Sequence, residues 1–160
     1  MTLNPGDWYL GNDCESVATV LGSCVAVTAW HPELKVGGFC HYILPAVPSS
    51  QRHLDPFHND NAGRYGKTAL ILLKKAMLRY APLKEYKIGL FGGSDSLSNY
   101  GIGKQNIFYA QQWLYDEKLT IDKKDVGGLI SRTLVLHLDS GVIDIKESPM
   151  KAITPPKKLK

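Results

Sequence analysis

The sequence contains few cysteines, and their spacing excludes a disulfide-stapled scaffold. Its 160 residues include 3 cysteines, Cys14, Cys24 and Cys40, and none of them forms a C-x-x-C pair. An odd number of widely spaced cysteines does not make a disulfide framework, and disulfides are rare in proteins that are not secreted. We therefore expect three free thiols.

Signals for membrane insertion and secretion are also missing. No run reaches the ~18 apolar residues that a membrane-spanning helix needs. The first residues, MTLNPGDWYLG, have neither the basic flank nor the apolar centre of a signal peptide. The composition, 44% hydrophobic and 21% charged, is typical of an ordinary globular domain. We expect one cytoplasmic domain without membrane insertion.

The folded part of the chain has no net charge to attract nucleic acid. The formal net charge is +4, but residues 151–160 hold four lysines and no acidic residue, which leaves 15 basic and 15 acidic residues elsewhere. We predict a single domain over residues 1–146 and a basic, disordered tail over residues 147–160. We interpret the tail as a solvated end rather than a site for nucleic acid.

A nucleotide-binding loop is not supported either. The Gly103-Lys104 pair lacks the glycine five positions before it and the hydroxyl residue after it that a phosphate loop requires, because Ser98 and Gln105 occupy those places.

The most informative part of the sequence is a pair of apolar, β-branched runs. Val25–Ala29 and Val36–Leu44 are joined by a short polar turn, and Pro45 ends the second run. This pattern predicts two buried strands paired as a hairpin. In an antiparallel pair, the start of one strand lies near the end of the other. Cys24 and His41 are therefore expected to lie close together, although they are 17 positions apart.

Periodicity predicts the remaining elements. Helical spacing indicates helices over residues 64–80 and 106–118. Residues 1–6 are expected to fray. Further strands are expected at residues 8–10, 86–91, 119–122, 133–138 and 142–145, with turns at 127–128 and 139–141. The order indicates an α+β fold with mixed or antiparallel sheet and the helices on one side.

A thiol beside an imidazole makes a nucleophile. An imidazolium at His41 would stabilise a thiolate at Cys24 and later protonate a leaving group. Gly22 and Ser23 precede the cysteine, and a tight turn of small residues can aim backbone N–H groups at one point, as an oxyanion hole requires. From the residues alone, a buried structural thiol and a satisfied core histidine remain alternatives. Cys40 neighbours His41 and should face the opposite side of the strand, into the core.

Several motifs together resemble a known family. They are TVLGSCVAV at residues 19–27, GGFCHYILP at 37–45, RYGKTAL at 64–70, FGGSDS at 91–96, IGKQN at 102–106 and GGLISR at 127–132. In this order they resemble the CheD-type chemoreceptor glutamine deamidases of bacterial chemotaxis. The resemblance covers residues 5–146.

The resemblance implies a fold and an activity. The fold would be a layered α-β-β sandwich. Cys24 would attack the side-chain carboxamide of a receptor glutamine, and His41 would transfer protons as a thioester forms and is hydrolysed to glutamate. Glutamyl methyl esters would be hydrolysed by the same route, and no metal or organic cofactor is needed. The implied partners are the cytoplasmic domain of methyl-accepting chemoreceptors and a CheC-type phosphatase.

Two loops are candidates for substrate contact. The glycine pair Gly92-Gly93 with Ser94 is either a plain turn or a substrate-cradling loop, and the resemblance favours the second interpretation. Residues 45–63 form a long loop after His41 that would make one wall of the site. His53 and His58 lie in this loop without ligand spacing, so we do not expect a metal there.

The chain departs from the family pattern at two positions. The family has a threonine six residues before the cysteine, where this chain has Ala18, and an arginine where it has Gln105. Thr19, one place later, is our candidate for the group that orients His41, and Ser23 is the other hydroxyl nearby. The alanine favours an alternative function, a binding module that regulates a CheC-type phosphatase or a receptor. A papain-like protease is a weaker third alternative, because a separation of 17 between Cys and His is far too short for that fold.

Overall fold

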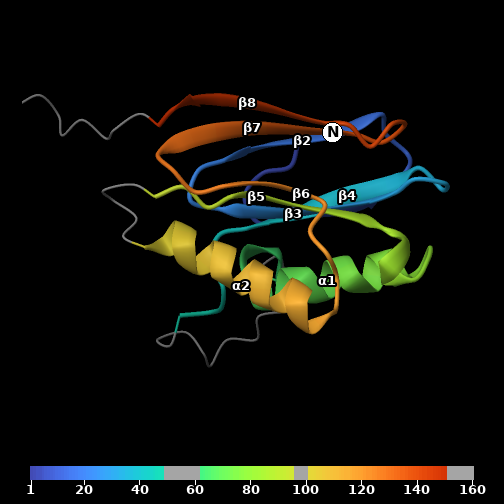
Figure 1. Ribbon diagram of the computed structural model, residues 1–160, viewed down its shortest axis with the longest axis horizontal. Coiled ribbons are helices and arrows are strands. Elements are labelled where there is room, and N and C mark those ends of the chain that lie inside the picture. The colour runs from blue at the N-terminus through green and yellow to red at the C-terminus, as the bar shows by residue number, and fades with distance from the viewer. Residues whose placement is uncertain (49–61, 96–100, 151–160) are drawn as a thin grey trace, which may run out of the picture.

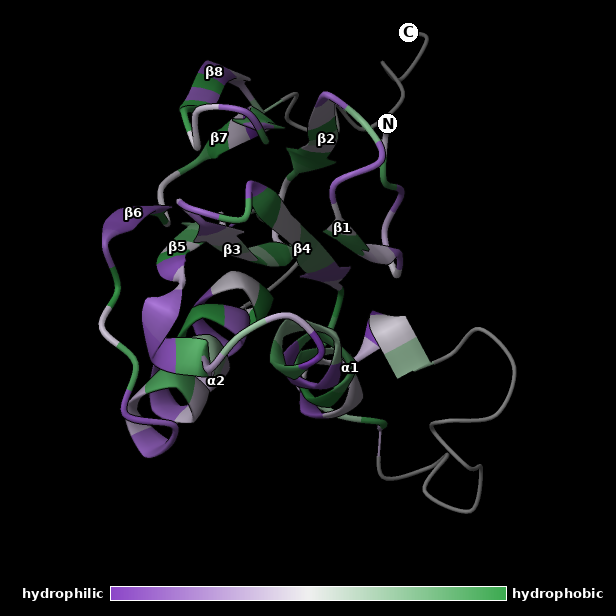
Figure 2. Cartoon of the chain, turned by 90° about the vertical axis from the view of Figure 1, so that its right-hand side faces the viewer, coloured by the Kyte–Doolittle hydropathy of each residue, from purple (hydrophilic) through white to green (hydrophobic). Residues whose placement is uncertain are grey.

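The chain folds into three layers. The computed structural model describes residues 1–48, 62–95 and 101–150, and within these ranges two α-helices, a five-stranded sheet and a three-stranded sheet lie one on another (Figure 1). Figure 2 shows both helices on the same side of the five-stranded sheet. This confirms the predicted α+β class and the α-β-β sandwich. Neither described helix is long and apolar enough to cross a membrane.

The predicted hairpin forms the centre of the five-stranded sheet. β3 and β4 pair antiparallel, with Ala26 opposite His41. β1 pairs with β4 and β5 with β3, both antiparallel, whereas β6 runs parallel to β5. In sheet order the strands are β1 (Trp8–Gly11), β4 (Val36–Tyr42), β3 (Val25–His31), β5 (Lys87–Gly92) and β6 (Lys123–Val126).

The three-stranded sheet is antiparallel, in the order β2 (Ser16–Leu21), β7 (Ile130–His137) and β8 (Ile143–Pro149). The sequence analysis did not predict β2, because its apolar residues run almost without a break into those of β3. The chain crosses from one sheet to the other at residues 22–24. β8 continues past residue 146 to Pro149, so residues 147–149 belong to the sheet. Residues 151–160 of the predicted tail lie outside the described residues.

Two amphipathic helices cover the outer face of the five-stranded sheet. α1 (Gly66–Leu78) and α2 (Ile102–Asp116) agree with the predicted helices, although α2 begins four residues earlier than expected. In α1 the buried positions include Ala69, Leu70 and Leu73, the apolar stripe that predicted it.

The strand predicted at residues 119–122 is wrong, because the fifth strand of the sheet, β6, begins only at Lys123. The Leu119 N–H still bonds back to the Leu114 carbonyl at the end of α2. Asp122 then joins the chain to β5, since its carboxylate accepts the Ile88 N–H at 2.7 Å. β6 is an edge strand whose first residues are exposed lysines, so it carries no apolar alternation that sequence analysis can detect.

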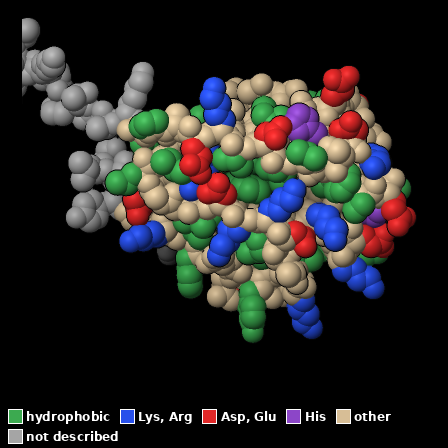
Figure 3. Space-filling model, turned by 45° about the horizontal axis from the view of Figure 1, so that its top comes forward, with side chains coloured by type: hydrophobic (Ala, Val, Ile, Leu, Met, Phe, Trp, Pro, Cys, Tyr) green, Lys and Arg blue, Asp and Glu red, His purple; other side chains and the backbone are tan. Residues whose placement is uncertain are grey.

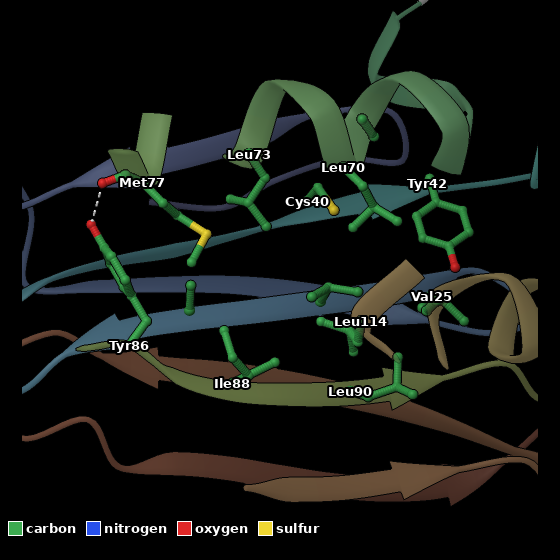
Figure 4. Packing of buried hydrophobic residues seen from close by; sticks show 14 of the residues in the cluster. Val25, Cys40, Tyr42, Leu70, Leu73, Met77, Tyr86, Ile88, Leu90 and Leu114 are labelled. Carbon is green, nitrogen blue, oxygen red and sulfur yellow. Dashed lines mark hydrogen bonds between the residues drawn. The ribbon is translucent and has the colours of Figure 1, made fainter. Parts of the chain in front are cut away.

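The five-stranded sheet separates two hydrophobic cores. The helix-side core lies between the sheet and the helices, where Leu70, Leu73 and Leu114 pack over Cys40 and Val25 (Figure 4). The inter-sheet core lies between the two sheets and contains Val17, Leu21, Phe39, Leu134 and Leu136. Successive side chains of a strand face opposite sides. Cys40 therefore faces the helices, as predicted, and its neighbours Phe39 and His41 face the other sheet.

Candidate active site

Cys24 lies at the crossing between the two sheets. It follows β2 and precedes β3, and its half-buried side chain packs against the inter-sheet core. The Cys24 carbonyl accepts a hydrogen bond from the Gly93 N–H at 2.8 Å, and the Gly22 carbonyl accepts one from the Ser94 N–H at 3.0 Å. The loop after β5 thus holds the turn that carries the thiol.

His41 lies on the same side of the sheet as Cys24. Its cross-strand partner is Ala26, two residues after Cys24, and residues two apart on a strand share a face. The imidazole is buried, with only 1% of its surface exposed. The fold therefore brings the thiol and the imidazole to one side of one end of the hairpin, as the antiparallel pairing predicted.

Thr19 contacts the imidazole of His41. Its Oγ1 donates to the Leu3 carbonyl at 2.8 Å and lies 2.7 Å from His41 Nδ1. A hydroxyl has one hydrogen. Because that hydrogen goes to Leu3, Thr19 must accept from His41, so Nδ1 carries the proton. Nε2 is then the unprotonated nitrogen of the neutral ring, and within the described residues it is buried without a hydrogen-bond partner.

Ala18 faces away from this site. β2 alternates, with Val17, Thr19 and Leu21 buried and Ala18 only partly so. The hydroxyl that contacts His41 therefore comes from Thr19, and Ala18 leaves no gap beside the imidazole. The departure that favoured a binding module does not remove the hydroxyl that contacts His41.

The N-terminal segment covers the site, contrary to the expected fraying. Leu3 is buried, and its N–H donates to the Ala18 carbonyl at 2.8 Å. The Gly6 N–H donates to the His41 carbonyl at 2.8 Å, and the His41 N–H donates to the Asp7 carbonyl at 3.1 Å. These bonds extend the sheets at their edges. They were invisible to sequence analysis because residues 1–6 lack a periodic apolar pattern.

Burial sets the charge state of the pair. Burial raises the pKa of the Cys24 thiol to about 11. Burial also lowers the pKa of His41 to about 4, against a smaller opposing effect of Asp7. Both shifts favour the neutral forms. The resting pair at pH 7 is therefore a thiol and a neutral imidazole, which differs from the thiolate and imidazolium expected from the sequence.

The loop at Gly92, Gly93 and Ser94 packs against the backbone of the turn that carries Cys24. Gly92 has a φ of +101°, and a side chain there would lie 2.3 Å from the Cys24 carbonyl oxygen. Only glycine permits both the backbone angle and the close approach. Ser94 is fully buried, and its hydroxyl donates to the carbonyl of Ile130. Contact of this loop with substrate stays a prediction.

Sequence analysis missed two buried polar residues that hold this region together. Asn106, on α2, is fully buried, and its side-chain amide donates to the Ser23 and Ile43 carbonyls. Arg132, on β7, is 2% exposed; it pairs with Asp125 at 3.1 Å and donates to Ser94 Oγ at 2.9 Å. Each lies in the apolar stripe of its helix or strand. A polar residue in such a stripe indicates a buried hydrogen-bond network, and this pattern could have identified both residues from the sequence.

Two further histidines pair with carboxylates away from this site. His137 makes an exposed pair with Asp144 at 2.8 Å, and His31 pairs with Glu85 at 2.9 Å. Among the described residues, no group of three or more His, Cys, Asp or Glu is placed to hold a metal ion. His53, His58 and most of the loop at residues 45–63 lie outside the described residues.

The outer surface near the three-stranded sheet carries charges of both signs. Figure 3 shows Lys and Arg interspersed with Asp and Glu on this face, with no large area of one sign. This face therefore lacks the basic stripe that would indicate a nucleic-acid partner.

Comparison with known proteins identifies the family. A model described as CheD chemotactic sensory transduction matches residues 46–147. A probable chemoreceptor glutamine deamidase CheD 1 from Chromobacterium violaceum is 36% identical over 154 residues, covering 91% of this chain and 76% of the relative. A probable chemoreceptor glutamine deamidase CheD from Pseudomonas syringae pv. tomato is 30% identical over 159 residues, covering 94% and 90% of the two chains.

These similarities agree with the fold and with the motifs in the sequence. The match to the family model begins after Cys24 and His41, so the roles of those two residues depend on the geometry described above. The length and identity of the two pairwise matches establish the relationship for nearly the whole chain. The chain belongs to the CheD family.

Proposed function

We propose that this chain is a chemoreceptor glutamine deamidase in which Cys24 is the nucleophile and His41 the general base and acid. The observation that carries the proposal is His41 Nε2, which is buried without a partner among the described residues on the side of the sheet that holds the thiol. We infer from the contact between Nδ1 and Thr19 that Nε2 is the unprotonated nitrogen. A nitrogen held in this tautomer is ready to take a proton.

The reaction begins with proton transfer from the neutral thiol. His41 Nε2 removes the Cys24 proton as the sulfur attacks the carboxamide carbon of a receptor glutamine. The imidazolium then gives this proton to the departing amide nitrogen, so that ammonia leaves and a thioester remains. His41, neutral again, activates a water that hydrolyses the thioester to glutamate and restores the thiol.

Backbone N–H groups at Ser23 and Cys24 would bind the oxyanion of the tetrahedral intermediate. Gly22 gives this turn its small profile, and the bonds from Gly93 and Ser94 hold it in place. Donors that are fixed before the reaction stabilise developing charge without reorganisation. All groups in this scheme belong to the protein, so it requires neither metal nor organic cofactor.

The same residues would hydrolyse a glutamyl methyl ester. Only the leaving group differs, since methanol replaces ammonia and receives the proton from His41. The printed names of the relatives refer to chemoreceptors. We propose the cytoplasmic domain of a chemoreceptor as substrate, which places the reaction in the cytoplasm.

The alternative is a binding module that acts on a CheC-type phosphatase or a receptor without catalysis. Its supporting feature was Ala18, and the contact between Thr19 and His41 removes that support. Binding of a CheC-type partner stays compatible with catalysis and is a separate prediction.

Mass spectrometry of a receptor cytoplasmic fragment tests the proposal. Incubation with the protein should convert defined glutamines to glutamate, with release of one ammonia for each. Cys24→Ala should abolish conversion, whereas Cys14→Ala, which removes the other partly buried thiol, should retain it. Conversion by the Cys24→Ala variant would rule out the proposed nucleophile. Binding of the fragment without conversion by the unaltered protein would favour the binding module.

A further inference from the structure

Asn106 connects the nucleophile turn to the end of the strand that carries His41. It lies on the buried face of α2, and its side-chain Nδ2 donates to the Ser23 carbonyl at 3.0 Å and to the Ile43 carbonyl at 2.8 Å. Ser23 directly precedes Cys24, and Ile43 follows His41 by two residues. One amide group therefore reaches both halves of the proposed site.

The bond to Ser23 fixes the direction of the next N–H. A peptide unit is planar, and in the trans form its C=O and N–H point in opposite directions; none of the described peptide bonds is cis. Asn106 draws the Ser23 C=O toward the helix layer. The N–H of Cys24, in the same peptide unit, therefore points to the opposite side of the sheet, where the His41 side chain lies.

The sulfur lies on the same side. The side chain of Cys24 packs against the inter-sheet core, which is the side of the sheet that His41 faces. A carbonyl carbon attacked by that sulfur would carry its oxygen within reach of this donor.

The two bonds that Asn106 donates explain why a polar residue occupies this buried position. Its Oδ1 is buried without a partner among the described residues, and an unsatisfied buried acceptor costs stability. An apolar residue would continue the stripe formed by Ala110 and Leu114 on the same face. Asparagine supplies the donors for two carbonyls, which an apolar residue does not.

We propose that Asn106 is a positioning residue that orients the Ser23–Cys24 peptide, so that the Cys24 N–H serves as the oxyanion donor. This deepens the proposed function and rests on it. Asn106 touches neither the sulfur nor the substrate; it acts through the carbonyl of Ser23.

The test compares two substitutions of Asn106 with a matched control. Asn106→Ala removes both donors, and Asn106→Asp keeps the shape but places an oxygen against two carbonyls. Tyr42→Phe is the control, because the Tyr42 hydroxyl donates to the backbone carbonyl of Asn106. The control therefore loosens the same turn of α2 and leaves the bond to Ser23 intact.

Three measurements separate positioning from general loosening. The first is the kcat for receptor deamidation. The second is the affinity for a receptor peptide that carries an aldehyde in place of the carboxamide. The thiol adds to this aldehyde, its proton moves to the oxygen, and the resulting hemithioacetal places that oxygen in the oxyanion position. The third is alkylation of Cys24 by iodoacetamide, a substitution in which no oxyanion forms.

We expect kcat and the aldehyde affinity to fall at least about tenfold in both Asn106 variants. The upper limit is the roughly 10²–10³-fold loss that follows complete removal of an oxyanion donor. KM and the alkylation rate of both Asn106 variants should stay close to those of the unaltered protein. Tyr42→Phe should keep its kcat, KM, aldehyde affinity and alkylation rate.

Three outcomes would overturn the proposal. They are a loss in the alkylation rate as large as the loss in kcat, the same losses in Tyr42→Phe, and an unchanged aldehyde affinity in the Asn106 variants. An unaltered protein that binds the aldehyde tightly but deamidates nothing would refute the proposed function, while the aldehyde comparison would still decide the role of Asn106. No aldehyde adduct in the unaltered protein would overturn that role.

Discussion

The two faces of the five-stranded sheet are built from the same strands but serve different purposes. On the helix side, the buried cluster consists of apolar residues with two tyrosines and Cys40, and Asn106 of α2 is a buried polar residue on this side. On the inter-sheet side, Thr19, His41 and Arg132 are buried next to an apolar cluster. β4 contributes to both, since Cys40 faces the helices and His41 faces the second sheet.

This contrast shows how a small domain can afford a buried reactive pair. Each large apolar side chain that leaves water contributes about 1.5–3 kcal/mol, and the helix-side core provides many of them. The inter-sheet side holds an imidazole nitrogen without a partner among the described residues, which lowers stability. The stable face thus keeps the reactive face in position.

Replacing the imidazole should have the largest effect on activity. His41→Gln removes the proton-accepting nitrogen, and a general base contributes roughly 10²–10⁴-fold to a rate. We expect kcat for receptor deamidation to fall by that factor while the helix-side core stays intact. Steady-state kinetics with urea unfolding of the same sample check this. A variant that unfolds in proportion to its lost activity would contradict the separation of the two faces.

Truncating a side chain in the helix-side core should lower stability and leave activity unchanged. Leu73→Ala truncates a residue that is 1% exposed, and such truncations cost about 2–5 kcal/mol through lost burial and the cavity left behind. We expect the urea midpoint to fall, with kcat per folded molecule nearly unchanged. A loss of kcat in fully folded Leu73→Ala protein would show that the two faces are coupled.

Acid should destabilise the reactive face through His41. Burial lowers the pKa of His41 from 6.5 to about 4, so between these values the unfolded state binds a proton that the folded state does not. Stability therefore rises with pH across this window and falls as the pH drops from 6.5 toward 4. The contribution is at most about 3 kcal/mol. Urea unfolding at several pH values gives the free energy of unfolding as a function of pH. Between pH 4 and 6.5 this free energy should change less with pH in His41→Gln than in the unaltered protein. The same dependence in both proteins would mean that another group titrates.

The hydrogen bond from His41 to Thr19 should have a smaller effect. Thr19→Val keeps the shape but removes the acceptor, and one hydrogen bond contributes about 1–1.5 kcal/mol, or roughly tenfold in rate. We expect kcat to fall by about that factor, and Thr19→Ser, which keeps the hydroxyl, to lose less. If the valine variant matched the unaltered protein in kcat, the imidazole would be held by other contacts.

Features with local signals could be predicted from the sequence. The hairpin of β3 and β4 follows from two β-branched runs, and α1 from its apolar stripe. The proximity of Cys24 and His41 follows from antiparallel pairing alone. Their chemical roles came from the motif resemblance, because a thiol and a histidine on paired strands are also common in ordinary cores.

Features that depend on tertiary contacts could not be predicted. β6 is largely polar and is held by its pairing with β5, next to the bond that Asp122 accepts from Ile88. The family's spacing pointed to Ala18; Thr19 was named only as the neighbouring hydroxyl, and its contact with His41 depends on which face of β2 packs against β4. Asn106 acts across a separation of 83 residues to Ser23, and no local pattern records such a distance. The neutral state of the thiol likewise depends on burial, which the turn sequence does not reveal.

Detection of the covalent intermediate tests the central claim most directly. A receptor peptide containing one glutamine is mixed with an excess of the protein, the reaction is stopped with acid within one turnover, and the intact mass of the protein is measured. We predict a species that has gained the peptide and lost one ammonia, joined through Cys24 and absent in Cys24→Ala. Complete conversion of the peptide with no such species at any quench time, or an adduct at another residue, would contradict the account.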